Sequence, residues 1–578
     1  MGFRDLVRKK DVALVLQEET GRCGGSAPGL RRDLNTADLV AFGIALIVGA
    51  GIFSTIGNAA YWGGPAVIFL YIFMAMACTC TALCYADFAS RLPVAGSAYT
   101  YSYVAFGEVV AWVIGWTLIM EYTIAASAVS ISWSDYFTGL IAGYGIHLPD
   151  HLSMDYFTAS KSAKRIVDLL SRGYVPGSIE KMPGMGPVLA GFRAYNDAPR
   201  FFGMPLIFDL PALCIVFLIT TLSYIGIRES KRITNGIVVI KIATILLVII
   251  AGAFYIRPEN WSPFAPNGVT GVLKGASAVF FAYLGFDAIS NTAEECKHPQ
   301  RDLPRGIIYS LLVCTLLYVA LALVLTGVVH HGNLRVGDPL VAAFSGDGAN
   351  LGFVSGIVAA SAVVTMATVV LALIISQPRV LMSMGRDGLL PAVFSSIHPR
   401  FRTPWFSTVV TGIIVALPTQ FMSLSSVTDL TSIGTLFAFI LVCGGVLVLD
   451  GRQDVPHGKF KVPRVNSRYI FTPGILVIGT ALCLAYPDYM KEWWNHTNSL
   501  AFLAITLFLA VASIVKGLSL IPLAGVEICL YLMTELGAVT WTGFTLWLCA
   551  GLACYLLYGR RHSKLNGKKG NIYNQGGF

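Results

Sequence analysis

The chain has 578 residues, of which 55% are hydrophobic and only 13% are charged, and its mean hydropathy is +0.68. Soluble globular domains carry about a quarter charged residues, so this composition excludes an ordinary water-soluble protein and indicates a polytopic membrane protein. The net charge of +9 invites a nucleic-acid interpretation, but with the N-terminus placed in the cytoplasm 29 of the 41 Lys and Arg fall in cytoplasmic segments. This is the positive-inside pattern of membrane topology, so no nucleic acid partner is expected.

Apolar windows long enough to cross a bilayer recur along the whole chain. A helix needs about 20 apolar residues to span ~30 Å of hydrocarbon. Fourteen such windows are centred near residues 50, 77, 122, 215, 245, 280, 317, 364, 413, 439, 478, 507, 527 and 549. They lack the alternation of barrel strands, so the sequence predicts an all-α fold with about 14 transmembrane helices in a lipid bilayer. The charge distribution predicts that both termini are cytoplasmic. The expected location is the plasma membrane or inner cell membrane.

Polar segments divide the chain into successive blocks. We predict a cytoplasmic N-terminal segment 1–37, five spans in 38–256 with a long external loop 142–204, five spans in 269–449, four peripheral spans in 470–558 and a cytoplasmic tail 559–578. The twelve cysteines lie almost wholly in the apolar spans and form no CxxC pair. Neither a disulfide framework nor a metal centre is indicated, and no cofactor is expected.

Glycine and polar residues interrupt the first and the sixth span. GAGIFS covers Gly49 to Ser54, and FFAYLGFDAIS covers Phe280 to Ser290. Because each interruption begins a group of five spans, and an odd displacement inverts topology, the pattern indicates two inverted repeats with discontinuous helices 1 and 6. Close helix packing at Gly49 and Gly51 is the alternative explanation.

Unwound turns at these two places would suit a zwitterionic amino acid. Backbone N–H groups at a positive helix end, such as those near Gly51, suit a carboxylate, and free C=O groups suit an ammonium. In the sixth span the segment from Phe280 to Gly285 would supply the carbonyls, and the bulky Phe281 or Tyr283 could close over the ligand.

Ionisable residues lie inside apolar spans. Lys241 is in the middle of the stretch from Ile233 to Ile256. A lipid-facing charge there is penalised by ~2.5–3.5 kcal/mol, so Lys241 is expected to face a cavity, a partner or an ion path. Glu121 lies ~16 Å into the third span, near the bilayer centre. Asp287 falls in the interruption of the sixth span, where it could stabilise the unwound segment or take part in gating.

Charged residues also gather at the cytoplasmic ends of the sixth and eighth spans. They are Glu294, Glu295, Lys297, Arg301, Arg305, Arg379 and Arg386. Such alternating charges often mark only a solvated boundary. The alternative is an inner gate of ion pairs, each worth only ~0–1 kcal/mol when exposed, which suits a contact that must open and close.

Several longer motifs resemble one known family. GAGIFS, the stretch FFAYLGFDAISNTAEECKHPQRDLPRGI that begins at Phe280, SQPRVLMSMGRDGLLP from Ser376 to Pro391, and SIGTLFAFILVCGGVLVL from Ser432 to Leu449 are similar to the cationic amino acid transporter family of the amino acid-polyamine-organocation (APC) superfamily. The resemblance covers most of the chain outside loop 142–204 and residues 470–516. It implies the five-plus-five inverted-repeat fold.

The resemblance also implies roles for individual residues. Ala50 and Gly51 would donate backbone N–H groups to the substrate carboxylate, and the carbonyls of Phe281, Ala282 and Leu284 would accept from its amine. Lys241 falls where proton-dependent relatives place a lysine and sodium-dependent relatives bind the ion. Because a partly desolvated lysine can lose and regain its proton, Lys241 would carry the coupling proton.

Three further positions follow from the same resemblance. Thr365 and Thr368 on the eighth span could line the volume around Lys241. Glu121 matches a carboxylate of the family, which makes it a second proton carrier or a charge in the substrate pocket, with a purely structural ion pair as the alternative.

The implied function is a secondary transporter that moves amino acids by alternating access and couples their movement to protons. Leu373 stands where relatives that accept arginine have a small residue, which favours small neutral amino acids without excluding cationic ones, since a few methylenes are worth only ~1–3 kcal/mol. A non-transporting sensor or partner subunit with the same fold is one alternative, and a uniporter or exchanger of amino acids or polyamines is another. An enzyme is not expected, because no HExxH motif, nucleotide-binding loop or nucleophile–base constellation is present.

Overall fold

The computed structural model describes residues 34–92, 97–179, 185–226, 231–345, 348–450, 458–494 and 498–565, together with Arg8 and Met182. Within these ranges the chain is helical apart from loops and one two-stranded ribbon, β1 (Arg200–Phe201) with β2 (Met204–Pro205). The predicted all-α fold is confirmed. Most of the predicted N-terminal segment 1–37, and the tail beyond residue 565, lie outside the described residues.

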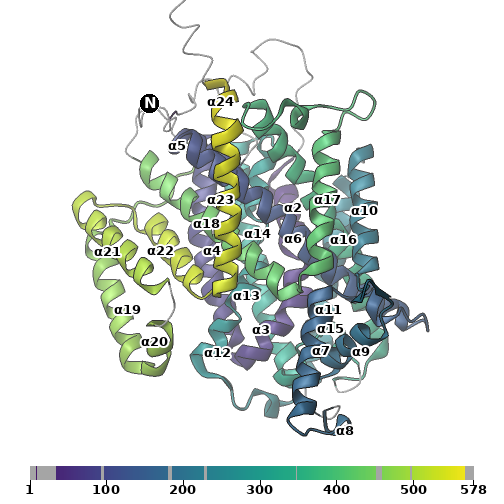
Figure 1. Ribbon diagram of the computed structural model, residues 1–578. Coiled ribbons are helices and arrows are strands. Elements are labelled where there is room, and N and C mark those ends of the chain that lie inside the picture. The colour runs from purple at the N-terminus through teal and green to yellow at the C-terminus, as the bar shows by residue number, and fades with distance from the viewer. Residues whose placement is uncertain are drawn as a thin grey trace, which may run out of the picture.

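Long apolar helices follow one another through the molecule (Figure 1). In chain order they and the shorter helices beside them are α2 (Thr36–Ile47), α3 (Ile56–Gly63), α4 (Val67–Arg91), α5 (Ser97–Ala105), α6 (Glu108–Ala142), α10 (Leu210–Ile225), α11 (Lys231–Ala253), α12 (Gly268–Lys274), α13 (Ala276–Ala282), α14 (Pro299–Val328), α15 (Pro339–Ala342), α16 (Gly352–Arg386), α17 (Trp405–Phe421), α18 (Leu424–Leu449), α19 (Phe471–Ala485), α20 (Pro487–Trp494), α21 (Ser499–Lys516), α22 (Leu520–Thr534), α23 (Ala538–Cys554) and α24 (Arg560–His562). Among the described residues, nine helical stretches are long and apolar enough to cross a bilayer, or ten if the bent pair α12–α13 is one span, and four shorter apolar helices accompany them. The count of fourteen stays a prediction.

The two ends of the helices are structurally distinct. The segment between α6 and α10 carries α7 (Tyr156–Ser171), α8 (Pro176–Ile179) and α9 (Gly186–Asp197). Figure 1 shows these three helices at the end of the molecule opposite α24. We call the end formed by residues 143–209 the loop face, and the end formed by residues 555–565 the tail face.

Two spans are interrupted near their middle. In the first span α2 ends at Ile47, and the chain resumes as the π-helix η2 (Gly51–Thr55) and α3. In the sixth span α13 ends at Ala282, and the chain resumes as the 3-10 helix η6 (Asp287–Glu295). The first break begins the series α2/α3, α4, α6, α10 and α11, and the second begins α12/α13/η6, α14, α16, α17 and α18. This order is that of the five-plus-five fold with discontinuous helices 1 and 6.

The peripheral helices show a pattern suited to lipid. α21 exposes most of its apolar side chains, whereas its buried residues are Ser499, Thr506 and Ser513, one every seven residues. Ser513 shares a hydrogen bond of 2.6 Å with Ser467, and Thr506 Oγ1 donates to Glu527 Oε1 at 2.7 Å. Helices packed in a membrane typically have small polar residues at their contacts and apolar side chains facing the lipid. The reason is that helices in lipid have no hydrophobic driving force for association.

Candidate functional site

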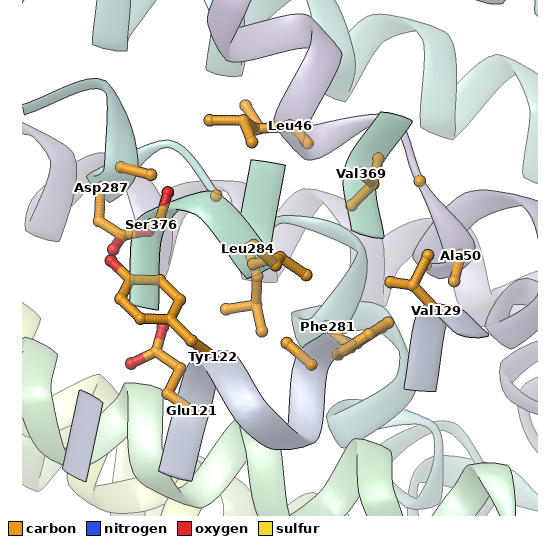
Figure 2. A pocket seen from close by; sticks show the side chains of 17 residues that line it. Leu46, Ala50, Glu121, Tyr122, Val129, Phe281, Leu284, Asp287, Val369 and Ser376 are labelled. Atoms are coloured by element: carbon orange, nitrogen blue, oxygen red, sulfur yellow. The ribbon is translucent and has the colours of Figure 1, made fainter. Parts of the chain in front are cut away.

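A cavity lies where the two interrupted spans meet α6 and α16 (Figure 2). Its volume is about 50 Å³, which is room for roughly three to five water-sized groups. The lining residues are Leu46, Ile47, Gly49, Ala50, Gly51, Glu121, Tyr122, Ala125, Val129, Phe281, Leu284, Gly285, Asp287, Ala288, Val369, Leu373 and Ser376. Every residue predicted to bind substrate is among them except Ala282.

The first break presents backbone N–H groups to this cavity. Val48 is extended, and the carbonyl of Gly49 accepts from the N–H groups of Ile52 and Phe53, both at 3.2 Å. The helical turn that starts at Ala50 and Gly51 leaves its first N–H groups without acceptors in the same helix, at the positive end of the helix dipole. This arrangement suits a carboxylate.

The sixth break presents carbonyl groups from the other side. The N–H of Tyr283 donates to Phe280 O at 2.9 Å and that of Leu284 to Phe281 O at 3.3 Å, which forms a tight turn. Gly285 then adopts φ +107°, a conformation that side-chain-bearing residues rarely adopt. A carbonyl oxygen has two lone pairs, so Phe281 O can still accept from a ligand ammonium.

The two breaks touch backbone to backbone. A Cβ atom on Gly51 would overlap the Cα of Ala282, so only glycine lets the first span approach the sixth at this point. Ala282 therefore packs against Gly51 of the first break, although it does not line the cavity. The contact brings N–H donors and C=O acceptors to opposite walls of one small space, which is the arrangement a zwitterion requires.

Lys241 reaches the first break from α11. Its side chain is 0% exposed, and Nζ donates to Ala45 O at 2.6 Å and to Val48 O at 3.1 Å. Tyr318 Oη donates to the neighbouring Ile47 O at 3.0 Å. These side chains satisfy carbonyls that the end of α2 leaves free, which a break in a membrane helix requires. Lys241 does not line the cavity, so it contacts the first break and not the cavity itself.

The threonines predicted near Lys241 lie on α16. Ser361 shares a hydrogen bond of 2.6 Å with Thr244, and Thr365 and Lys241 lie one turn further along the two antiparallel helices. Thr365 is therefore close to Lys241, and its buried Oγ1 has no hydrogen-bond partner among the described residues. Thr368 Oγ1 instead bonds within its own helix, to Thr365 O at 2.7 Å.

Two carboxyl groups lie at one end of the cavity. Glu121 is 4% and Asp287 2% exposed, and Figure 2 shows the ring of Tyr122 between them. Glu121 lies beside Thr435 of α18, whose Oγ1 donates to Thr431 O at 3.1 Å, and Glu121 Oε2 has no hydrogen-bond partner among the described residues. None of the residues lining the cavity is Lys, Arg or His. This lining disfavours a structural ion pair for Glu121.

The other end of the cavity is apolar. Figure 2 shows Val129, Phe281 and Val369 at this end, and Leu373 also lines the cavity. Phe281 and Leu373 were predicted from the sequence, whereas Tyr122, Val129, Val369 and Ser376 were not. Helical spacing could have found three of them, because Val369 and Ser376 lie four residues before and three after Leu373, and Val129 lies eight residues after Glu121.

The cavity is covered toward the loop face. Tyr136 Oη on α6 donates to Phe53 O in the first span at 2.6 Å. The carbonyl of Leu334, in the loop after α14, lies directly against Gly57 of α3. A ligand in the cavity is thus separated from the loop face by α3 and the segment that packs on it.

Among the residues predicted to gate, Tyr283, Gly285 and Asp287 lie at the sixth break, and Arg379 lies on α16. Tyr283 is buried and donates its hydroxyl to Tyr71 O at 3.0 Å, which favours a structural role over gating. Arg379 is exposed on α16. The side chains of Glu294 and Glu295 lie outside the described residues.

A buried ion-pair network near the tail face was missed by the sequence analysis. Arg91 contacts Asp87 at 2.5 Å and Asp450 at 3.1 Å, and the side chains of Arg91 and Asp87 are 5% and 1% exposed. It joins the end of α4 to the end of α18. The spacing of Asp87 and Arg91, four residues apart at the end of a span, was the available signal.

Comparisons with known proteins agree with this architecture. Residues 34–518 match the model of the family described as amino acid permease, and residues 518–563 match the model described as the C-terminus of that permease. The chain is 38% identical to the methylthioribose transporter of Bacillus subtilis (strain 168), over 97% of this chain and 99% of that protein. It is 37% identical to a branched-chain amino acid permease of the same organism, over 97% and 98%. It is 29% identical to the vacuolar cationic amino acid transporter 4 of Arabidopsis thaliana, over 93% of each chain.

Proposed function

The chain belongs to the amino acid permease family, and from that premise we propose that it is a proton-coupled secondary transporter of small neutral amino acids that works by alternating access. The observation that carries the proposal is the backbone contact of the two breaks, at Gly51 and Ala282, beside a small cavity. N–H groups near Ala50 bind the carboxylate, and the carbonyls of Phe281 and Leu284 bind the ammonium.

The preference for small neutral side chains rests on the cavity wall. Val129, Val369 and Leu373 offer only apolar contacts, and the cavity volume is about 50 Å³. A relative named as a branched-chain amino acid permease supports an apolar substrate. The carboxyl groups of Glu121 and Asp287 would suit a cationic side chain as the second choice, in line with the relatives named as cationic amino acid transporters.

A thermal-shift screen of purified protein identifies the ligand, because a compound that binds the native state raises its apparent stability. The screen contains the twenty amino acids and also methylthioribose, which one relative is named for. We expect alanine or another small neutral amino acid to give the largest shift. A shift by methylthioribose alone would contradict an amino acid substrate.

Replacing Leu373 with Ala is expected to widen the accepted range of side chains. The smaller residue removes apolar bulk from the cavity wall, and a few methylenes of space are worth ~1–3 kcal/mol, or about 10- to 200-fold in relative uptake of a long over a short side chain. Competition of leucine and arginine against labelled alanine measures the change. An L373A variant with the selectivity of the wild type would show that Leu373 does not bound the substrate. Leu476 on α19, which is 65% exposed, is the matched control.

The place of Lys241 supports the proposed proton coupling. When protonated, the amine holds the carbonyls of Ala45 and Val48 and so fixes the end of α2 at the break. Loss of the proton weakens both hydrogen bonds and frees α2 to move relative to α11. The same break binds the substrate carboxylate. Protonation of Lys241 and binding of the substrate therefore both shift the equilibrium between positions of α2, and such a shared equilibrium is what coupling requires.

Reconstituted vesicles separate the possible modes of transport. With an inward proton gradient and no sodium gradient, we expect accumulation of the amino acid that gave the largest thermal shift, and with a sodium gradient alone we expect none. Accumulation driven only by sodium would contradict the proposed coupling. Exchange without response to either gradient would indicate an exchanger, and binding without any flux would indicate a sensor.

A further inference from the structure

We propose that the ribbon β1–β2 inserts its tip into the lipid bilayer and so attaches the loop face to the membrane surface. The tip consists of Phe201, Phe202 and Met204, and we call these three residues the ribbon tip. Its partner is the lipid of the leaflet next to the loop face. The inference concerns the surface of the protein and does not depend on the substrate or on proton coupling.

The ribbon tip is apolar and exposed. Its three side chains are between 66% and 90% exposed. The rings of Phe201 and Phe202 meet edge to face with their centroids 4.7 Å apart, so they project as one apolar unit. The stretch 200–208 reads RFFGMPLIF and contains no acidic residue. Single exposed apolar side chains are ordinary, but a contiguous group of them is typical of a protein or membrane contact.

The turn of the ribbon holds a side chain that it does not need. Phe201 pairs with Met204, so Phe202 and Gly203 form a two-residue turn, with φ +49° and +80°. A turn with positive φ at both positions favours Asn-Gly, and bulky residues rarely adopt such a φ. Asparagine would form this turn with less strain than phenylalanine. The ring of Phe202 is the most exposed of the tip, so it serves a contact outside the protein.

The base of the ribbon is fixed to the helices of the loop face. The N–H of Leu206 donates to Pro199 O at 2.8 Å, and that of Phe208 donates to His151 O at 3.1 Å. Ile207 is buried in the small core that α7 and α9 share. The ribbon tip therefore projects from a rigid support, and its insertion requires little loss of chain entropy.

The helix that follows the ribbon is too short to cross the bilayer alone. α10 has 16 residues, which span ~24 Å, whereas the hydrocarbon layer is ~30 Å thick. Beyond the tail-face end of α10 the sequence soon carries the charged residues Arg228, Lys231 and Arg232. Before its loop-face end stand the apolar residues 206–208. The missing apolar length therefore falls on the side of the ribbon, and residues that flank a short span commonly make up such a mismatch.

The lipid-facing side of α10 leads toward the ribbon. Figure 1 shows α10 at the edge of the molecule, on the side where α9 lies. The exposed apolar side chains of α10 are Leu210, Phe217, Leu218 and Ile225. Asp209 stands before them in the sequence, but it is buried, and its Oδ1 accepts from Ser134 Oγ at 2.6 Å and from the N–H of Ala212 at 2.9 Å. No exposed charge thus separates Leu210 from the exposed Leu206.

The base of the tip carries a charge that suits a lipid headgroup. Arg200 is exposed and pairs with Pro205 across the ribbon, one position before the two rings. Arginine keeps its guanidinium at the level of the phosphates while its stem and its apolar neighbours lie deeper. Basic and aromatic side chains in this order are typical of segments that lie in the membrane interface.

A photoreactive analogue of phenylalanine tests the contact in the full-length protein. p-Benzoylphenylalanine is placed at Phe202, in nanodiscs of phosphatidylcholine and phosphatidylglycerol, and lipid adducts are counted by mass spectrometry of the intact protein. We expect adducts at Phe202 as at Phe217, which is the lipid-facing reference on α10. The matched control is Val175, which is exposed and lies next to α8, at the outermost point of the loop face in Figure 1. We expect about ten-fold fewer adducts there, since burial of a phenylalanine ring favours apolar surroundings by this factor or more.

The other outcomes of the photoreaction overturn the inference. Equal yields of lipid adduct at Phe202 and Val175 would show that the ribbon tip stays in water. Cross-links from Phe202 to a second copy of the chain, in place of lipid adducts, would show that the tip contacts protein.

A second variant separates lipid contact from turn formation. Phe202→Asn suits the turn but removes the ring, so a ribbon without lipid contact should exchange its amide hydrogens as slowly as the wild type or more slowly. The proposed contact predicts the opposite, namely exchange in residues 199–206 roughly ten-fold faster in nanodiscs, because the buried ring no longer holds the ribbon. Val175→Asn is the control and should leave this segment unchanged. Unchanged or slower exchange in Phe202→Asn would contradict the proposal.

Discussion

Replacing Gly51 with Ala is expected to reduce amino acid transport about 100-fold, since a misplacement of about 1 Å in a binding constellation can cost this much. The added Cβ would overlap the Cα of Ala282, so the first and sixth spans must move apart where their breaks meet. Backbone atoms cannot turn aside as a side chain can, so we expect a loss of stability toward the upper end of the ~1–3 kcal/mol typical of overpacking. Uptake and counterflow into vesicles measure the first effect, and the melting temperature measures the second.

Two other glycines make the test specific. A Cβ on Gly49 would lie 3.2 Å from Val369 Cγ2, a side-chain atom that can shift, so Gly49→Ala should cost less than Gly51→Ala. Gly236 on α11 has no atom within 4 Å of the added Cβ, so Gly236→Ala should leave transport unchanged. If Gly51→Ala transports like the wild type, the close approach of the two breaks is not needed for function.

Replacing Lys241 with Met is expected to abolish accumulation driven by a proton gradient. The change leaves the buried carbonyls of Ala45 and Val48 without their shared donor, and each unsatisfied buried group costs ~1–3 kcal/mol. We therefore expect a lower melting temperature as well as lost coupling. Uptake with and without an imposed gradient, measured beside a thermal melt, reports both effects.

Lys241→Arg separates coupling from stability. Arginine keeps the positive charge and the donors but does not release its proton at any relevant pH. We expect this variant to be more stable than Lys241→Met and still unable to use the proton gradient. Gradient-driven accumulation by Lys241→Arg at the rate of the wild type would show that Lys241 serves the fold and that the coupling proton is carried elsewhere.

The sequence identifies the breaks because their causes are local. A continuous helix is disfavoured by the glycine pair in the first span, whatever surrounds it. The same holds for the sixth span, where the stretch FAYLG precedes Asp287. The burial of Lys241 is equally predictable, because a charge in the middle of a span must find a polar environment. The structure places its amine at the end of α2, where two carbonyls accept its hydrogen bonds.

The contacts between distant parts of the chain were not predictable in the same way. Arg91 pairs with Asp450, which lies 359 residues later, and Thr435 meets Glu121 from a helix in the other group of five spans. Tyr283 has the size to close over a ligand, yet its hydroxyl bonds to Tyr71 O in α4. Such choices depend on the rotation of each helix about its axis, which spacing along one helix does not fix relative to its neighbours.

The side chains that form the cavity wall illustrate both situations. Leu373 was identified through a resemblance, and Val369 and Ser376 lie on the same face of α16 at helical spacing. The facing residues on α6 follow the same rule, with Glu121, Ala125 and Val129 in one line. The residues that share one face of each helix can be predicted from the sequence. Only the structure shows that the faces of α6 and α16 meet across one cavity.

An experimental structure with a bound amino acid tests the central claim most directly. The ligand is the amino acid that gives the largest thermal shift, and its position is read from the density. We expect its carboxylate within hydrogen-bond distance of the backbone N–H groups of Ala50 and Gly51, and its ammonium at the carbonyls of Phe281, Ala282 or Leu284. Density for the ligand away from these two breaks, or a ligand held only by side chains, would contradict the account.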